Sequence, residues 1–426
     1  MKVELIQPLH ADYGGLGKRE NFIFKPAQLT MPYIAALTPP DVEVSISDEM
    51  VEPIDFQTDA DLVGITFVTP FAQRAYELAS IFKKKGKKVV MGGPHASLFP
   101  DEVKGHADAV VIGEAEDTWP ALIEDFKRNN LKRFYRSNAP ELRSLPFARR
   151  DLLKREKYII SDVIQASRGC PFSCDFCALA SVYGKGQRLR PVDEVISEIE
   201  TFQDDTFIFW DDNIAGTPAY AQELFKRLIS LGKKWLGQGS ITIARDRELL
   251  DMASRSGCIG LFVGIESVSQ VSLMTVNKGF NKVDTLKDDI RKFHDAGIAV
   301  LAGIIFGFDT DDKSIFERTL ETAVKAAIDG ISFSILTPYP NTVLFQRLKA
   351  EQRILHYDWS KYNSEYVVFI PKMMSPDELQ EGHNWATRQF YSIPSIIKRL
   401  LKSRTQLGLT IKLNQANRRY SYGRFK

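Results

Sequence analysis

Apolar runs typical of β-strands alternate with helical stretches twice along this chain, and this alternation restricts the fold more than any other feature. Over residues 1–140 these runs read KVELIQP, VEVSISD, DLVGITF, KKVVMGGP and ADAVVIGEAE. Helical stretches such as FAQRAYELASIFKKKG, which ends at a glycine, separate the last three. Buried runs separated by helices predict a doubly wound parallel sheet, whose ligands bind at the carboxyl ends of its strands.

A second alternating series follows a charged, proline-containing linker at residues 141–157. We expect its strands near residues 158–166, 206–211, 235–241, 258–266, 298–306 and 330–337. The clearest helix is 191–203, because Val192, Val195, Ile196, Ile199 and Phe202 recur at helical spacing after Pro191. Six βα units predict a partial (β/α)6 barrel with its chemistry at the carboxyl ends of the strands.

These patterns predict four regions. An α/β domain covers residues 1–140, the linker covers 141–157, the partial barrel covers 158–354, and a small α-rich cap with a basic tail covers 355–426. The 426 residues are 44% hydrophobic and 26% charged, as in globular proteins. Four cysteines do not make a disulfide framework, and no apolar run reaches the roughly 18–20 residues of a membrane span. We therefore expect a cytoplasmic protein.

Three cysteines, Cys170, Cys174 and Cys177, form a C-x3-C-x2-C array within ASRGCPFSCDFCALA. Three close thiolates can hold three irons of a four-iron four-sulfur cluster and leave the fourth iron without a protein ligand. The alternative is a tetrahedral zinc site, which needs four Cys or His ligands. No histidine lies near the array, and Cys258 is far away in sequence.

The array resembles the hallmark of the radical SAM superfamily, whose members bind S-adenosylmethionine (SAM) on the open iron. The resemblance implies an electron from a partner such as flavodoxin or ferredoxin. That electron splits SAM into methionine and a 5′-deoxyadenosyl radical, which removes a hydrogen atom from a small-molecule substrate. Phe176, just before the third cysteine, matches the aromatic residue that these proteins usually have there, with its backbone near adenine.

The same resemblance assigns residues at the strand ends to SAM. Asp211 and Asp212 in FIFWDDN would take the methionine amino group, although they could instead cap the next helix. Glu266 would bind the ribose and Lys278 the carboxylate. An ion pair for Glu266 and a solvated loop position for Lys278 are the alternatives. The remaining candidates are Gln238, Ser240 and Gly303.

The pattern DLVGITFVT, GGPHASLFP and ADAVVIGEAE resembles the cobalamin-binding domain that precedes many radical SAM proteins. Because no D-x-H-x-x-G motif is present, no histidine is expected below cobalt in that way. The alternative is a sheet that kept the fold and lost the cofactor. The residues expected to hold cobalamin are Tyr13, Gly14, Thr66, Thr69, Phe71, Gly92, Gly93, His95, Gly113, Glu114 and Glu116.

The last third, with FGFDTDD, FSILTPYPNT and FYSIPSIIKRL, resembles hopanoid C-methylating enzymes and their relatives. The resemblance implies methylation of an unactivated carbon in a lipid-like or tetrapyrrole substrate. One SAM would methylate cobalamin and a second would give the adenosyl radical, so that the substrate radical takes methyl from methylcobalamin. One alternative is a radical enzyme with an empty first domain that performs cyclisation or carbon–carbon coupling. The other is a non-catalytic cobalamin or iron–sulfur sensor.

From Gly382 to Lys426 the chain has ten Lys/Arg and no Asp/Glu. Ile393, Ile396, Ile397, Leu400 and Leu401 recur at helical spacing beside Lys398, Arg399, Lys402 and Arg404. This pattern favours either a solvated surface or an interfacial helix in peripheral contact with the inner membrane. Nucleic acid is not an expected partner, because no recognition module accompanies the charge.

Overall fold

The computed structural model describes residues 1–9 and 26–423, and the chain divides into two compact units. The N-terminal unit contains Met1–Val163 together with Ser181–Gly184 and Asp358–Asn363. The barrel unit contains Ile164–Ala180, Lys185–Tyr357 and Ser364–Lys426. The region 355–426, which the sequence analysis treats as one cap and tail, is therefore divided between the two units.

In the described part of the N-terminal unit, six strands form one sheet of order β2-β1-β3-β4-β5-β6, and each neighbouring pair is parallel. The predicted doubly wound sheet is confirmed, and β6 is a short strand that the sequence analysis missed. The order changes direction between β1 and β3, where such sheets bind ligands. The strands are β1 Lys2–Gln7, β2 Glu43–Asp48, β3 Leu62–Thr66, β4 Lys88–Gly92, β5 Ala109–Ile112 and β6 Phe134–Arg136.

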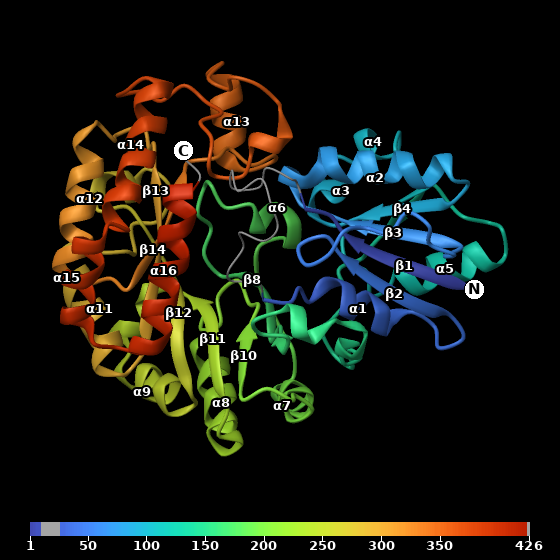
Figure 1. Cartoon of the computed structure of the whole chain (residues 1–426), viewed down its shortest axis with the longest axis horizontal. Coiled ribbons are helices and arrows are strands. Elements are labelled where there is room, and N and C mark those ends of the chain that lie inside the picture. The colour runs from blue at the N-terminus through green and yellow to red at the C-terminus, as the bar shows by residue number, and fades with distance from the viewer. Residues whose placement is uncertain (10–25, 424–426) are drawn as a thin grey trace. The chain divides into compact units, whose positions relative to one another are not determined.

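Helices cover both faces of this sheet (Figure 1). One face packs against α2 (Ala72–Lys84), which buries Ala72, Ala75, Leu78, Ala79 and Phe82. The other face packs against α1 (Thr30–Leu37) and α5 (Trp119–Lys127). Two short helices follow β4, namely α3 (Pro94–Leu98) and α4 (Pro100–Val103). Both faces are apolar, which explains why the strands read as continuous hydrophobic runs.

In the described part of the barrel unit, six strands form a second sheet of order β14-β13-β12-β11-β10-β7, with parallel pairing from β10 to β14. These six strands match the series expected from the sequence. They are β7 Val163–Ile164, β10 Thr206–Phe209, β11 Lys234–Gly239, β12 Cys258–Glu266, β13 Ala299–Phe306 and β14 Gly330–Ile335. Between β7 and β10 lies an antiparallel hairpin that was not predicted, formed by β8 (Ser167–Cys170) and β9 (Gly186–Leu189).

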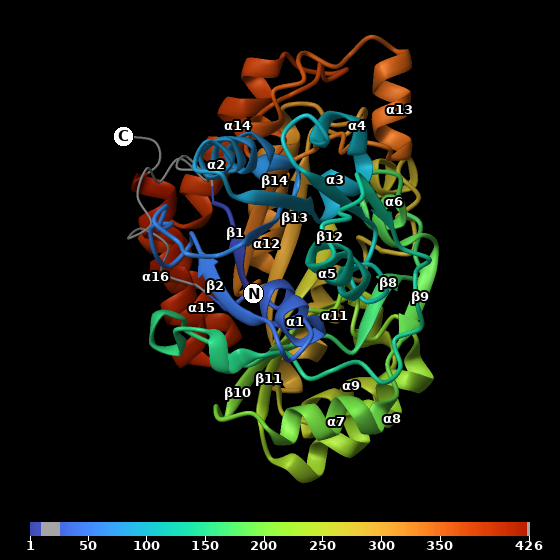
Figure 2. The same ribbon diagram turned by 90° about the vertical axis from the view of Figure 1, so that its right-hand side faces the viewer.

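Helices connect the barrel strands and pack against them (Figure 2). The predicted helix at 191–203 is observed as α7 (Val192–Glu200), with Val192, Val195, Ile196 and Ile199 buried. Phe225 of α8 lies in the same core, against the Trp235 ring of β11 at a centroid distance of 5.3 Å. The other helices up to residue 350 are α6 Leu179–Tyr183, α8 Pro218–Leu228, α9 Arg247–Arg255, α10 Gln270–Met274, α11 Leu286–Asp295, α12 Ser314–Lys325 and α13 Val343–Ala350.

The C-terminal residues form three further helices, α14 (Pro376–Phe390), α15 (Ile393–Ser403) and α16 (Leu407–Gly423). Arg399 of α15 is 0% exposed, although the sequence analysis placed it on a basic surface. Its guanidinium donates to the carbonyl oxygens of Ile328 and Asp329, each at 2.9 Å, and to Oδ1 of Asn414 at 2.8 Å. It also lies 3.7 Å from the centroid of the Phe390 ring. Part of the basic tail is thus built into the fold.

Within residues 1–9 and 26–423, no helix is both long and apolar enough to cross a membrane.

Replacing Arg399 by Met is expected to lower the free energy of unfolding by about 3 kcal/mol or more, because several buried acceptors lose a charged donor. Urea denaturation followed by circular dichroism measures this change. Lys398→Met is the control, because Lys398 is exposed and its loss should cost about 0.5 kcal/mol or less. Equal unfolding midpoints for the two variants would contradict the assigned role.

Candidate functional site

The three clustered cysteines lie together at the start of the barrel unit. Cys170 ends β8, Cys174 and Cys177 follow in the next loop, and all three are half-buried. Burial raises the pKa of Cys174 to about 11, and the negative charges of Cys177, Glu266 and Cys170 act in the same direction. Burial also raises the pKa of Cys177. Their thiolates therefore need a positively charged partner, and iron supplies one.

The cysteine loop is tied to two other segments of the barrel unit. Asp175 donates its backbone N–H to the carbonyl of Val276 at 3.2 Å and accepts from the N–H of Leu344 at 2.9 Å. The Asn277 side chain donates to the carbonyl of Ser173 at 2.9 Å. These bonds hold the loop before any metal binds.

Among residues 1–9 and 26–423, no three His, Cys, Asp or Glu side chains are arranged to hold a single metal ion. A cluster site differs from such a site, because each thiolate binds a different iron. A preformed loop with three half-buried thiols fits the cluster. Cys258 is buried at the amino end of β12, where the sequence analysis placed it.

Phe176 lies inside the loop and packs against the core of the barrel unit. Its ring meets Phe308 edge-on at a centroid distance of 6.3 Å. Nearby, Phe172 stacks on Phe280 at 4.1 Å. The Phe176 ring is half-buried in this packing, and the predicted contact with adenine is through its backbone.

Asp211 points into the protein. It is 2% exposed and accepts hydrogen bonds from the Ala166 N–H at 3.0 Å and the Ser167 hydroxyl at 2.5 Å. Burial raises the pKa of Asp211 to about 7, even though these two bonds favour its charged form. Asp212 is half-buried and accepts from the Gly169 N–H at 2.9 Å. Both carboxylates thus bind the segment that leads to Cys170, a role that the sequence analysis did not foresee.

Gln238 lies near the end of β11 and Ser240 directly follows that strand, and their environments differ. Gln238 is exposed and donates to the Asp212 carbonyl at 3.2 Å. Ser240 is buried, and its hydroxyl accepts from the Thr242 N–H at 3.4 Å at the start of a 3-10 helix, Ile241–Arg245. Gln238 therefore stays accessible, whereas Ser240 is used as a helix cap.

Glu266 and Lys278, which were predicted to bind different parts of SAM, bind each other. Lys278 Nζ lies 3.0 Å from Glu266 Oε1, and the two side chains are 13% and 11% exposed. Burial by itself lowers the pKa of Lys278, but the charges of Glu266 and Cys174 outweigh it and raise that pKa. Lys278 also favours the thiolate of Cys174. The ion-pair alternative for Glu266 matches this geometry, whereas a solvated loop lysine does not.

Gly303 was expected to give a ligand room to approach the backbone of β13. A Cβ at this position would lie 2.9 Å from the ring of Phe262 on β12. The space that the glycine leaves is therefore filled by a neighbouring side chain of the barrel itself.

The expected cobalamin residues of the N-terminal unit lie at the carboxyl ends of β3, β4 and β5. Thr66 pairs with Gly92, and the Gly113 N–H donates to the Ser97 hydroxyl at 2.9 Å. Gly93 has a φ of +95°, and a Cβ there would lie 2.7 Å from Thr66 Oγ1. A larger residue at 93 would thus distort this edge itself.

Exposure separates the candidates along this edge. Gly113 is exposed, and Phe71, Glu114 and Glu116 are half-buried. An edge of glycines and exposed Val68 is compatible with a large planar ligand held by backbone and small side chains, whereas the hydroxyls of Thr66 and Thr69 are buried. The donor set therefore fits a corrin. Tyr13 and Gly14 lie outside the described residues.

His95 is 0% exposed and cannot offer its ring to a ligand. Its Nδ1 lies 3.2 Å from Thr69 Oγ1, and its Nε2 lies 3.2 Å from the hydroxyl of Tyr76. Trp359 packs against the ring at a centroid distance of 5.9 Å. Only the backbone of His95 is left for a contact with cobalamin, and the buried hydroxyl of Thr69 is likewise engaged.

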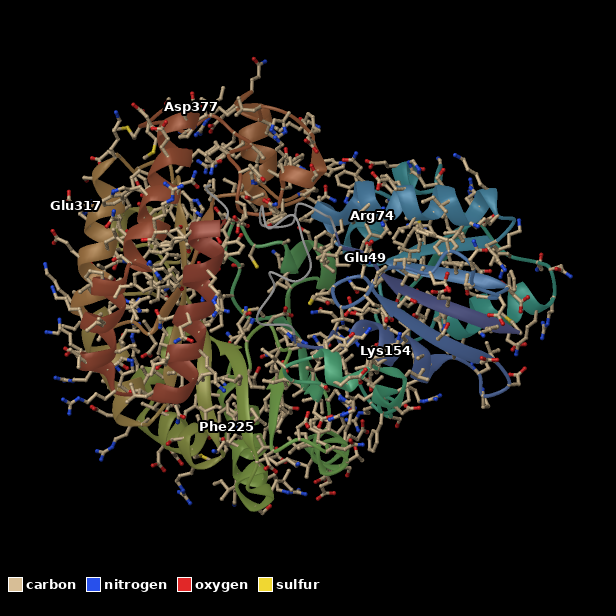
Figure 3. All side chains as sticks on the ribbon, in the orientation of Figure 1. Glu49, Arg74, Lys154, Phe225, Glu317 and Asp377 are labelled. Carbon is tan, nitrogen blue, oxygen red and sulfur yellow. The ribbon has the colours of Figure 1, made fainter. Side chains whose placement is uncertain are left out.

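Sequence reasoning missed several residues of these two sites. Glu49, directly after β2, pairs with Arg74 of α2 at 2.6 Å and accepts from the Leu9 N–H at 2.9 Å (Figure 3). In the barrel unit, Asn213 Nδ2 lies 3.7 Å from Cys170 Sγ. The position of Asn213 directly after the two aspartates was a signal that could have been used.

Comparisons with known proteins agree with this architecture. Residues 164–351 match the radical SAM superfamily, residues 31–123 match the B12 binding domain, and residues 342–424 match a domain of unknown function. The solved structure of OxsB, a cobalamin-dependent S-adenosylmethionine radical enzyme, covers 100% of this chain and 72% of its own with a TM-score of 0.71 and 15% identity. At that identity the likeness establishes the fold.

Two curated relatives cover most of the chain. The bacteriochlorophyllide d C-12(1)-methyltransferase of Chlorobaculum tepidum is 33% identical over 387 residues, which is 87% of this chain and 84% of the relative. The hopanoid C-2 methylase of Rhodopseudomonas palustris is 26% identical over 85% of this chain and 75% of the relative. With the cysteine loop and the two parallel sheets, these matches place the chain in the cobalamin-binding class of the radical SAM superfamily, as a methyltransferase that uses a four-iron four-sulfur cluster, SAM and cobalamin.

Proposed function

We propose that Cys170, Cys174 and Cys177 ligate the cluster and that SAM lies over the carboxyl ends of β10 to β13. The convergence of three half-buried thiols beside Lys278 carries this assignment. When bound, the cluster supplies the electron that cleaves SAM, and cobalamin supplies a carrier for methyl. The chain positions the thiolates, and the Lys278 charge favours their ionised form.

Among the residues expected to bind SAM, Asp212, Gln238 and the Glu266–Lys278 pair keep polar atoms at this edge. We assign them to SAM. We assign Asp211 and Ser240 a structural role, because their side chains are buried and accept hydrogen bonds from backbone N–H groups. At the edge of the N-terminal sheet we assign Thr66, Phe71, Gly92, Gly93, Gly113, Glu114 and Glu116 to cobalamin.

The inferred substrate is a hydrophobic ring system, either a tetrapyrrole or a polycyclic lipid, methylated at an unactivated carbon. This rests on 33% identity across 87% of the chain to a relative named for bacteriochlorophyllide, and on a second relative named for a hopanoid. Both names denote large apolar ring systems. A soluble one-electron donor such as flavodoxin or ferredoxin would reduce the cluster.

An apolar stripe on α15 supports contact with an anionic membrane, where such a substrate would be found. Ile393, Ile397 and Leu401 recur every four residues and are 54%, 53% and 66% exposed. Lys398 and Lys402 are exposed beside them. An exposed apolar row flanked by cations, in a segment without acidic residues, is complementary to anionic lipid headgroups.

Replacing any one of Cys170, Cys174 and Cys177 by Ala is expected to abolish SAM cleavage, because two thiolates cannot hold the cluster with an open iron. The measurements are iron content and 5′-deoxyadenosine release after anaerobic reconstitution. Cys258→Ala is the matched control and should keep its iron. Loss of iron from Cys258→Ala together with retention in Cys174→Ala would show that the ligands are assigned wrongly.

With SAM carrying a deuterated methyl group, the reconstituted enzyme is expected to transfer the label to a chlorophyllide-type tetrapyrrole or to a hopanoid. Mass spectrometry should find one S-adenosylhomocysteine and one 5′-deoxyadenosine for each methyl transferred. Formation of 5′-deoxyadenosine without labelled product would favour the cyclising or coupling alternative. Absence of both nucleosides with every substrate tested would favour the sensor.

Liposome co-sedimentation tests the membrane contact. The full chain should sediment with anionic vesicles more than with neutral ones, and less as salt increases. The double variant Ile397→Glu/Leu401→Glu should lose this binding, whereas Met373→Glu, which changes an exposed methionine elsewhere, should keep it. Point variants are used because removal of the residues from 393 onward would also remove the buried Arg399. Equal recovery with both vesicle types would refute the contact.

A further inference from the structure

Three consecutive residues after β10 each bind the segment that leads to the first cysteine. Asp211 accepts from Ala166 and Ser167, and Asp212 accepts from Gly169. Asn213 continues the series and reaches the sulfur of Cys170, with Nδ2 3.7 Å from Sγ. The three side chains thus engage successive positions of residues 166–170, and the last contact is with a proposed ligand atom of the cluster.

Asn213 has little freedom to move away from that sulfur. It is 3% exposed, and its backbone carbonyl accepts hydrogen bonds from the Gln187 side chain at 2.7 Å and from the Gly216 N–H at 3.0 Å. Gln187 is itself fixed, because its side chain also donates to the Ser167 hydroxyl at 2.9 Å and accepts from Thr217 at 2.9 Å. The backbone that carries the Asn213 amide is therefore fixed beside Cys170.

The chemistry of the cluster decides which end of the amide faces the sulfur. A free thiol can donate a hydrogen bond to an amide oxygen, but an iron-bound thiolate can only accept one. Iron ligation at Cys170 therefore requires Asn213 to present Nδ2, as it does here. The other end, Oδ1, is buried and has no hydrogen-bond partner among the described residues. Burying a polar side chain with one unsatisfied atom is unfavourable, and packing does not explain it.

We propose that the Asn213 amide donates an N–H···S hydrogen bond to cluster-bound Cys170 and thereby raises the reduction potential of the cluster. Reduction adds negative charge that spreads onto the sulfur ligands, so a donor directed at one sulfur stabilises the reduced form more than the oxidised form. Cys177 receives a comparable bond from the backbone N–H of Leu179, which a change of side chain other than to proline leaves in place. Asn213 is the replaceable donor of this pair. The proposal rests on the assignment of Cys170 as a cluster ligand.

The test is the midpoint potential of the cluster in the reconstituted full-length chain, followed by electron paramagnetic resonance during a redox titration. Asn213→Leu removes the donor at similar volume and should shift the midpoint to more negative values with iron content unchanged. Asn213→Asp keeps the shape and replaces the donor by a negative charge, so its shift should be larger in the same direction. Resonance Raman spectra in D₂O should lose the solvent-isotope shift of an iron–sulfur mode in both variants.

Asn281→Leu is the matched control. Asn281 is also 3% exposed and also has an unpartnered buried Oδ1 among the described residues, but its Nδ2 donates to the carbonyl oxygens of Gly264 and Ile265. This variant should leave the midpoint unchanged. If both Asn213 variants keep their iron with the original midpoint, the proposal is wrong. If both lose their iron while Asn281→Leu keeps it, the tuning role is refuted and Asn213 is only part of the loop's support. The ligand assignment is checked separately with Cys170→Ala in the chain that keeps Asn213. This variant should lose its iron.

Discussion

Hydrogen bonds between residues 211–213 and residues 166–170 connect the second strand of the barrel to the segment that carries the first cysteine. The position of the cysteine loop depends on them, because β8 pairs only with β9 and belongs to no larger sheet in the described chain. Burial of Asp211 is unfavourable for its charge, as its raised pKa shows. The two hydrogen bonds that Asp211 accepts from residues 166 and 167 offset part of the free energy lost by burying its charge.

The sequence predicted the position and burial of a residue wherever these depend on the periodicity of its own strand or helix. The strand series of both sheets, α7 and the place of Cys258 at the start of β12 follow from apolar periodicity, and the structure confirms them. The short strands β6 and β8 were missed because three or four residues leave no period to detect. The hairpin also contains Arg168, Arg188 and two glycines, which do not resemble a buried strand.

Ion pairs and hydrogen bonds between residues far apart in the sequence could not be predicted from one sequence. Glu266 and Lys278 were each predicted as SAM-binding candidates, but their ion pair depends on how the loop after β12 folds back. Asp211 and Asp212 were predicted to face a ligand, and the sequence did not show that both also accept hydrogen bonds from backbone N–H groups, those of residues 166 and 169. Arg399 was counted with the surface charges, although four acceptors from three segments enclose it. Charge and spacing identify such residues, and only the tertiary fold shows what they bind.

The segment Asp358–Asn363 gives the N-terminal unit a discontinuous boundary in the chain. Tyr362 of this segment is 0% exposed, and the ring of Trp359 lies 5.0 Å from the ring of Phe99. A fragment that stops at residue 163 would leave the faces of His95 and Phe99 uncovered. Exchanging cobalamin-binding domains between members of this family therefore means transplanting three pieces of sequence, residues 1–163, 181–184 and 358–363, because a graft of the first piece alone leaves these rings without their cover.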